Sequence, residues 1–269
     1  MPRVAVVIPC FNDGLLAIEA VRSVQEDEDV ELVVVDDGST DAETKTALAE
    51  LTRNGATVLH KANGGPASAR MAGVDTTTAP YLFPLDADDL LLPGSLRLLA
   101  DALDAAPQTA FAYGDYEIFG DYTGYYRSPE HFDRWALLYA NHIPACSLIR
   151  REELVEAGGW MRQGYEDWDL WLALADRDRR ATYVGAAVYR HRVHEGRRLG
   201  ADRADHRRIY AELRRRHSEL FAQRKELRRE SKPTFWKRAA YPIVFGKKHF
   251  PVWFEEWLKR QMFTRGLRP

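Results

Sequence analysis

Short apolar runs and segments of helical periodicity alternate along the first part of the chain. Four runs, rich in β-branched or aromatic residues, have the length and pattern of buried parallel strands; they are residues 4–8, 31–35, 57–60 and 81–85. Apolar residues at helical spacing fill the intervals. Ser39, Thr40 and Asp41 are good N-caps for the second helix. The alternation predicts an α/β fold, in which a mostly parallel sheet carries helices on both faces.

The pattern continues less regularly in the second half. It predicts strands at 111–116, 146–149 and 182–188, and helices at 95–103, 151–157 and 166–175. Between Glu117 and His142 the periodicity weakens and aromatic residues accumulate. These aromatic residues either pack a second lobe, which we favour, or form a stacking surface for a sugar.

Carboxylates stand where two of the predicted strands end. The run 81–85 stops at Asp86-Ala87-Asp88-Asp89, and the run 31–35 stops at Asp36-Asp37. The carboxyl ends of parallel strands meet at one edge of a sheet, where ligands of such sheets bind. Adjacent negative charges need a cation or hydrogen-bond donors, and a hard divalent ion with a diphosphate on its far side meets that need. The alternative is an acidic turn or N-cap, where Asp is common.

A second acidic cluster opens the predicted helix at 166–175. Glu166, Asp167 and Asp169 crowd its first turn beside two tryptophans. Carboxylates there complement the helix dipole. Alternatively, one of them is a general base, since an apolar wall would partly desolvate it.

The glycine loop at 63–66 lacks both common phosphate-binding signatures. Asn63-Gly64-Gly65-Pro66 precedes a helix that carries Arg70 one turn in, and its two glycines permit close approach to a ligand. It matches neither the G-x-G-x-x-G fingerprint nor a Walker lysine motif.

Charge divides the chain into an acidic body and a basic tail. Residues 1–205 carry a net charge of −14 and residues 206–269 a net charge of +12, counted from the sequence. Residues 205–230 show a basic helical pattern, and 234–263 mix aromatic residues with cations. That tail suits peripheral contact with an anionic membrane surface, packing back onto the body, or a homodimer contact. Nucleic acid is a poorer partner, because no base-reading motif is present and the body is acidic.

Features of the sequence favour the cytoplasm, with contact at the inner face of the membrane as an option for the tail. The start resembles no secretory signal. Apolar runs stay well below the roughly 18 residues of a membrane span. Cys10 and Cys146 match no metal or redox motif, which suits a reducing compartment.

Taken in order, the motifs resemble those of the family 2 glycosyltransferases. The resemblance covers about residues 3–195. It rests on V-V-I-P-C-F-N, V-V-V-D-D-G-S-T-D, N-G-G-P-A-S-A-R, L-D-A-D-D, G-Y-E-D-W-D-L-W and Y-R-H-R-V-H. Such a family implies the GT-A fold, a Rossmann-like sandwich typical of nucleotide-diphospho-sugar transferases, here followed by a helical basic and aromatic tail.

The resemblance also implies roles for individual residues. It assigns Asp167 as general base, with Glu166 beside it, and Asp88 and His194 as ligands of Mn²⁺ or Mg²⁺. Nucleotide binding is assigned to Pro9, Phe11, Asp13, Asp37, Arg70, Asp86 and Ala87. We therefore expect a catalytic domain at 1–204, with a nucleotide-binding half at about 1–115 and an acceptor-side half at about 116–204, and a helical extension at 205–269.

The function that the resemblance implies is metal-dependent, inverting sugar transfer. The donor is a nucleotide-sugar, with UDP the expected carrier, and the acceptor hydroxyl belongs to a glycan, a lipid-linked glycan or a small molecule. The main alternative is a nucleotide-sugar-binding module without turnover, in a glycan-assembly complex. A sugar nucleotidyltransferase is less favoured, because it would require a glycine-rich loop after the first strand. A phosphatase using Asp36 would leave the clusters at 86–89 and 166–169 unexplained.

Overall fold

The structure is a computed structural model. It describes residues 1–161, 164–194, 199–232, 234–235, 237–238 and 241, with backbone alone at 199–205 and 207. Most of the predicted aromatic and basic segment at 234–263 therefore lies outside the described residues, as does Arg162.

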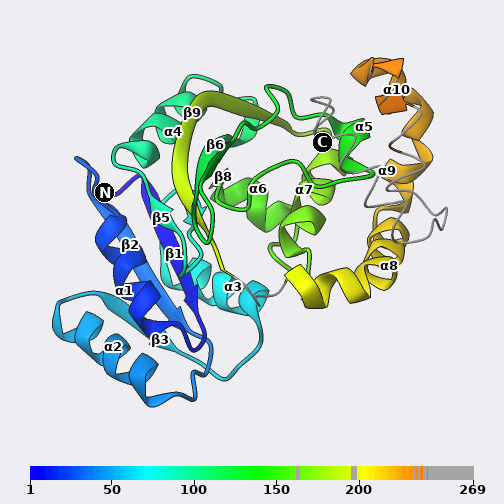
Figure 1. Ribbon diagram of the computed structural model, residues 1–269. Coiled ribbons are helices and arrows are strands. Elements are labelled where there is room, and N and C mark those ends of the chain that lie inside the picture. The colour runs from blue at the N-terminus through cyan, green and yellow to red at the C-terminus, as the bar shows by residue number, and fades with distance from the viewer. Residues whose placement is uncertain (162–163, 195–198, 233, 236, 239–240, 242–269) are drawn as a thin grey trace.

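The described residues form one nine-stranded sheet flanked by helices (Figure 1). The strands are β1 Val4–Cys10, β2 Val30–Asp36, β3 Thr57–His60, β4 Tyr81–Pro84, β5 Leu90–Leu91, β6 Thr109–Gly120, β7 Gly124–Tyr126, β8 Leu148–Arg150 and β9 Arg180–Val193. The helices are α1 Gly14–Ser23, α2 Ala42–Arg53, α3 Pro66–Thr76, α4 Ser95–Asp104, α5 Arg134–Leu137, α6 Arg151–Glu156, α7 Glu166–Asp176, α8 Leu199–Arg216, α9 Ser218–Ala222 and α10 Arg224–Ser231.

The sheet is parallel in its first half and mixed in its second. Its order is β3-β2-β1-β4-β8-β6-β9-β5, with β7 paired to β6. The four strands predicted from the first part of the chain are mutually parallel. Beyond them, β8 runs antiparallel to both β4 and β6, while β6 and β9 are parallel. A period-two or continuous apolar pattern does not encode strand direction, so the sequence did not predict this change.

Helices cover both faces of the sheet, as predicted. Val4, Val6 and Ile8 of β1 belong to the core shared with α1, α2 and α4, whereas Ala5 belongs to the core shared with α3 and α7. A Cβ built on Gly73 of α3 would lie 2.3 Å from Val7 Cγ1. The glycine therefore permits α3 to lie close against β1 and β2.

Three short elements were not predicted, and two strands are longer than predicted. β5, β7 and α5 contain two, three and four residues, too few for a periodic pattern to be recognised. β6 and β9 extend to Gly120 and Val193, and their extra residues reach the edge where the acidic loops lie.

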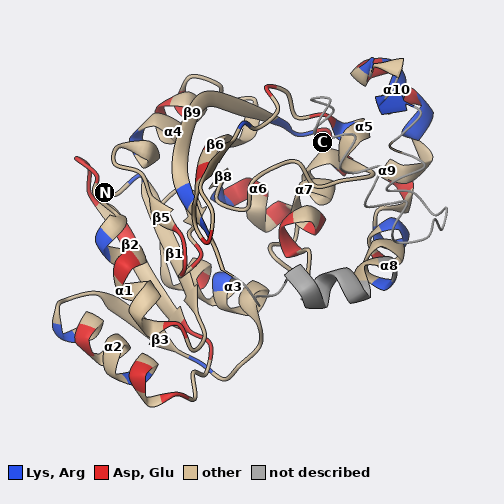
Figure 2. Cartoon of the chain, in the orientation of Figure 1, with Lys and Arg blue, Asp and Glu red and all other residues tan. Residues whose placement is uncertain are grey.

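The basic tail folds back onto the body as three helices rather than one. Figure 1 shows α8, α9 and α10 in succession beside α7 and α5. Their apolar residues face inward and are buried; they are Ile209, Tyr210, Leu213, Leu220, Phe221 and Leu227. Lys and Arg colour α10 and the described end of α8 in Figure 2. Of the contacts considered for the tail, packing onto the body is therefore the one observed for residues 206–231.

None of the helices in the described part of the chain has both the length and the apolar character needed to cross a bilayer.

Candidate active site

The loops that follow the parallel strands meet at one edge of the sheet. Asn12 lies in the loop after β1. Its side-chain Oδ1 accepts a hydrogen bond from the Thr40 backbone N–H at 2.8 Å, and its backbone N–H donates to Ser39 Oγ at 3.0 Å. The first two loops are thereby joined. Pro9 and Asp13 are partly buried beside this junction, and Phe11 is exposed at 45%.

Asp37 lies beneath the glycine loop. Its carboxylate accepts hydrogen bonds from Lys61 Nζ at 2.7 Å, Gly64 N at 3.0 Å and Gly65 N at 2.7 Å, and the residue is 3% exposed. This carboxylate shapes the loop that precedes α3. Its predicted contact with a nucleotide stays a prediction.

Asp36 is a structural carboxylate. Its oxygens lie 2.8 Å from the Ser39 amide, which donates to it, and 2.9 Å from His60 Nδ1. Burial would raise the pKa of Asp36, but the hydrogen bonds from Ser39 and the contact with His60 outweigh it and lower the pKa. A buried carboxylate with both oxygens engaged makes a poor nucleophile, which disfavours the phosphatase alternative.

The three carboxylates after β4 have different surroundings. Asp86 Oδ1 accepts a hydrogen bond from Arg70 Nη2 at 2.6 Å. Asp89 is 2% exposed; it accepts from the Arg192 amide at 2.9 Å and lies 3.1 Å from His191 Nδ1. Desolvation raises the pKa of Asp89 to about 6, against the opposing effect of His191. Residues at the end of β9 thus supply some of the hydrogen-bond donors that this acidic turn requires.

Asp88 and His194 form the pair predicted as metal ligands. The two residues are 106 positions apart in sequence, yet Asp88 Oδ2 lies 2.9 Å from His194 Nε2. Arg192 Nε donates to the Asp88 carbonyl at 2.9 Å, which fixes the loop against β9. The side chains of Asp88 and His194 are 21% and 28% exposed, respectively, so a ligand can reach them. Ala87 beside them is buried.

Arg70 connects this loop to the second acidic cluster. Its Nη2 donates to Asp86 and its Nη1 donates to Glu166 Oε1 at 3.0 Å. The residue is 4% exposed, and its guanidinium lies 5.9 Å from the centre of the Trp160 ring. Both terminal nitrogens of Arg70 are therefore engaged by carboxylates at the place where the resemblance implied a contact with the nucleotide.

The three carboxylates at the start of α7 have distinct partners. Glu166 pairs with Arg70. Asp169 is buried, with His217 Nε2 at 2.7 Å and Arg216 Nη1 at 3.2 Å. Asp167 instead accepts hydrogen bonds from uncharged groups, Asn141 Nδ2 and its neighbour's amide, the Trp168 N–H, both at 2.8 Å.

The surroundings of Asp167 raise its affinity for a proton. Burial is the largest cause and the Glu166 carboxylate the next, and together they raise the pKa of Asp167 to about 6, against the Trp168 amide and Arg70, which lower it. A carboxyl group with such a pKa is still ionised at neutral pH and is a far better base than an exposed Asp.

Some residues of this site were not foreseen from the sequence. Asn141, Lys61 and His191 each engage a predicted carboxylate, but only the fold brings them together. Three aromatic residues of 117–142 pack in or against the core, as favoured: Phe132, Trp135 and Tyr139. Trp135 is 2% exposed and stacks on Tyr241. Tyr122 and Tyr125 are exposed.

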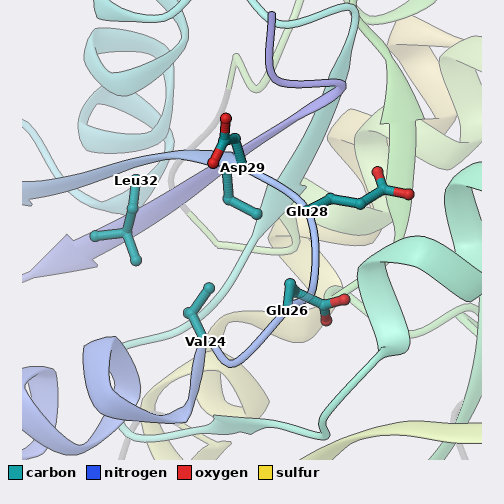
Figure 3. Close-up of a pocket in the computed structure, with 6 residues that line it drawn as sticks. Val24, Glu26, Glu28, Asp29 and Leu32 are labelled. Carbon is teal, nitrogen blue, oxygen red and sulfur yellow. The ribbon is translucent and has the colours of Figure 1, made fainter.

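A separate pocket lies at the opposite end of the sheet. Figure 3 shows it in the α1–β2 connection and the start of β2, lined by Val24, Glu26, Glu28, Asp29, Val30 and Leu32. Glu26 there accepts hydrogen bonds from the Leu96 and Arg97 amides of α4, and Glu28 accepts hydrogen bonds from Arg3. Because ligands of such sheets bind at the carboxyl ends of the strands, this pocket is not the candidate site.

Solved structures with a similar fold have been determined with nucleotide-sugars. Residues 1–349 of S. aureus TarS, in complex with UDP-GlcNAc, align with a TM-score of 0.66 and 16% identity, covering 92% of this chain and 76% of that one. The mannosyltransferase PcManGT from Pyrobaculum calidifontis, in complex with GDP-Man and Mn²⁺, aligns with a TM-score of 0.62 and 19% identity, covering 100% and 76%. These likenesses confirm the predicted GT-A fold.

Sequence comparison adds a relative and a family. The protein y4gI of Sinorhizobium fredii, described as uncharacterized, is 30% identical over 222 residues, which cover 76% of this chain. The chain spans 24% of the length of that relative, and 16%, 16% and 14% of three Rickettsia proteins described as uncharacterized glycosyltransferases. Residues 5–158 match the family described as Glycosyl transferase family 2. This match includes the four parallel strands and the acidic loops, and it confirms the resemblance: the chain belongs to glycosyl transferase family 2.

Proposed function

We propose that this protein transfers a sugar, with inversion at the anomeric carbon, from a nucleoside-diphosphate donor to an acceptor hydroxyl. The observation that carries the proposal is the environment of Asp167. Among the three acidic residues at the start of α7, it alone has uncharged side-chain and amide partners, and its pKa is raised to about 6. Family membership supplies the reaction class, and the two similar structures with bound nucleotide-sugars support the donor class.

In the proposed step Asp167 acts as general base. The acceptor oxygen forms a bond to the anomeric carbon as the bond from that carbon to the diphosphate oxygen breaks. The hydroxyl proton passes to a carboxylate oxygen of Asp167, and the electron pair of the broken bond leaves with the nucleoside diphosphate. A single displacement of this kind inverts configuration and needs no enzyme nucleophile, unlike retaining glycoside hydrolysis. Asn141 orients the carboxylate by donating to Oδ2.

The pair Asp88 and His194 fits a divalent cation. Carboxylate oxygens suit Mg²⁺ and Mn²⁺, and imidazole is a ligand of several transition metals. A divalent ion at such a site is commonly held by one or two protein groups together with substrate phosphates. The chemistry supplied by such an ion is neutralisation of charge on the departing diphosphate.

We assign nucleotide binding to the loops at the carboxyl edge of the parallel strands. Pro9 lies at the end of β1, Phe11 and Asp13 follow it, and Asp86 and Ala87 follow β4. Asp37 contributes through the Gly64-Gly65 loop that it holds. Arg70 contributes by pairing with Asp86, which holds that carboxylate in place.

The donor is identified by titration calorimetry with UDP, GDP, dTDP and CDP, each with Mn²⁺ and with EDTA. We expect tight binding of one nucleotide, UDP by family resemblance, that depends on the metal. The matching nucleotide-sugars are then tested for turnover. Binding without turnover across a panel of acceptors would favour the alternative, a binding module in a glycan-assembly complex.

The activity is expected to depend on pH through Asp167. A base must be deprotonated to accept a proton, so activity falls when the pH drops below its pKa. The pKa of about 6 predicts that kcat/KM is constant above about pH 7 and decreases tenfold per pH unit well below pH 6. The measurement is a pH–rate profile at saturating metal. A profile that is flat down to pH 4.5 would contradict the assignment.

The division of the chain and its location are also proposals. We assign the catalytic domain to residues 1–204, with its nucleotide-binding half at about 1–115, and the helical extension to 205–269. The cations and aromatic residues of 234–263 suit peripheral contact with the cytoplasmic face of a membrane. Deleting residues 234–269 is expected to release the protein from vesicles that contain anionic lipid, as measured by co-sedimentation. Absence of any vesicle binding by the full chain would contradict this.

A further inference from the structure

The first turn of α7 has two faces with different partners. Glu166 and Asp167 face Arg70 and Asn141, on the side of the candidate site. The other residues of the turn, Tyr165, Trp168 and Asp169, contact the C-terminal extension.

Each of those three contacts is made by a different residue of α8 or its junction with α9. Tyr165 OH lies 3.1 Å from His206 Nδ1. The Trp168 ring stacks on Tyr210, with ring centres 5.7 Å apart and planes 29° apart. Asp169 Oδ1 lies 2.7 Å from His217 Nε2. The extension thus contacts the residue two positions before Asp167 and the two residues after it.

The extension also fixes the segment that carries Asn141. Tyr210 OH donates to the Leu138 carbonyl at 2.7 Å, and Ser231 Oγ donates to Asp133 at 2.7 Å. The Trp168 indole N–H donates to the carbonyl of Leu137 at 2.8 Å, which closes the connection between α7 and this segment. The Asp167 carboxylate is positioned by Asn141 and by the Trp168 amide. The extension therefore holds both the segment that carries Asn141 and the helical turn that carries Trp168.

The contact at Asp169 is buried. Asp169 is 3% exposed and His217 is 4% exposed, and Arg216 approaches the second carboxylate oxygen at 3.2 Å. A buried hydrogen-bonded pair of this kind is costly to break, because removing one partner leaves the other without compensation. This geometry makes the contact a rigid one.

We propose that α8 and α9 form a brace that fixes the first turn of α7 and so sets the position of Asp167, with His217 and Tyr210 as positioning residues. This inference rests on the proposed function for its kinetic consequence. The extension lies outside the residues matched to the family. The proposal gives it a role in turnover, in addition to any contact with a membrane surface. Misplacement of a reacting group by about 1 Å costs up to about 100-fold in rate.

The test compares His217→Ala, His217→Gln and the control Ser218→Ala in the full chain. Ser218 is exposed and adjacent to His217. We expect His217→Ala to lower kcat by about tenfold or more with donor KM and nucleotide affinity changed by less than about twofold, the pattern of a lost interaction that acts in the transition state. Glutamine carries an N–H at a similar reach, so His217→Gln should recover most of the rate. Ser218→Ala should behave as the unchanged protein.

Hydrogen exchange supplies a readout that does not depend on activity. In His217→Ala the amides of 165–169 and 138–141 should exchange faster, while those of β1 and β2 are unchanged. If folded His217→Ala retains full kcat and unchanged exchange, the brace is wrong. Loss of kcat together with nucleotide affinity and protection throughout the sheet would also overturn it, because that is general destabilisation.

Two further measurements keep the outcome decisive. If His217→Ala does not fold, Tyr210→Phe replaces it, since it keeps the stacked ring and removes only the hydroxyl bound to Leu138; the same loss of kcat and the same exchange pattern are expected. If the unchanged protein binds nucleotide but turns over no donor, the proposed function fails, and the exchange comparison still decides whether the brace exists.

Discussion

Asp167→Asn is expected to lower kcat by about three orders of magnitude, within the 10²–10⁴-fold range that a general base contributes. The amide keeps the shape of the side chain but accepts no proton. Nucleotide affinity should change by less than about twofold, because Asp167 lies on α7 and the proposed nucleotide loops follow β1 and β4. Turnover is measured with the donor found by titration, and affinity is measured by calorimetry.

Two comparison variants separate the base from its neighbours. Asp176→Asn makes the same chemical change at the exposed last residue of α7 and should leave kcat unchanged. Glu166→Gln should have a smaller effect than Asp167→Asn, because Glu166 is paired with Arg70 and acts through it. If Asp167→Asn keeps more than about a tenth of the activity, or if Glu166→Gln is the more damaging change, the base has been assigned to the wrong carboxylate.

The parallel half of the fold was predictable because its strands contain short apolar runs that are mostly buried in β1, β4 and the end of β2. Residues 4–8 are a continuous apolar run that became a strand with almost no exposed surface, and Val33, Val34 and Val35 are buried in the second half of β2. The N-cap was equally local: Asp41 accepts the Thr44 amide at 2.7 Å, as its position before the helix suggested. Such features depend on neighbours in sequence, which a pattern can represent.

The partners of the acidic residues were not predictable, because they come from distant parts of the chain. The sequence shows Glu166, Asp167 and Asp169 as equivalent carboxylates in one helical turn. The fold distinguishes them by bringing up Arg70, Asn141 and His217, which lie 96, 26 and 48 positions away. The same holds for Asp88, whose neighbour His194 was assigned only through the family resemblance.

Family resemblance did not foresee the partners of Arg70 or the packing of the tail. The resemblance implied that Arg70 lies near the nucleotide, which stays a prediction, and the fold shows that its guanidinium joins Asp86 to Glu166. The tail's composition left membrane, subunit and body as alternatives, and burial of Leu213 and Leu220 establishes contact with the body for the described helices. Amphipathic helices show which face is buried and not what covers it.

The second large effect is expected from Asp88→Asn. A neutral amide is a much weaker ligand for a hard divalent ion than a carboxylate. The metal-dependent part of nucleotide affinity should therefore fall by about 100-fold, the upper end of the 10–100-fold typical of changes to outer-shell partners. Titration with Mn²⁺ should then resemble titration of the unchanged protein with EDTA. Asn keeps the size of Asp88 and can still contact His194 Nε2, which lies 2.9 Å from Oδ2, so the loop should keep its position.

Controls for Asp88→Asn use another acidic residue and the paired histidine. Asp75→Asn alters an exposed carboxylate of α3 and should leave the metal dependence intact. His194→Ala should weaken metal-dependent binding less than Asp88→Asn, because an imidazole supplies no negative charge to the ion. Unchanged affinity in Asp88→Asn, with Mn²⁺ still required, would place the ion elsewhere. Strong loss in His194→Ala alone would instead make the imidazole, rather than the carboxylate, the principal ligand of the site.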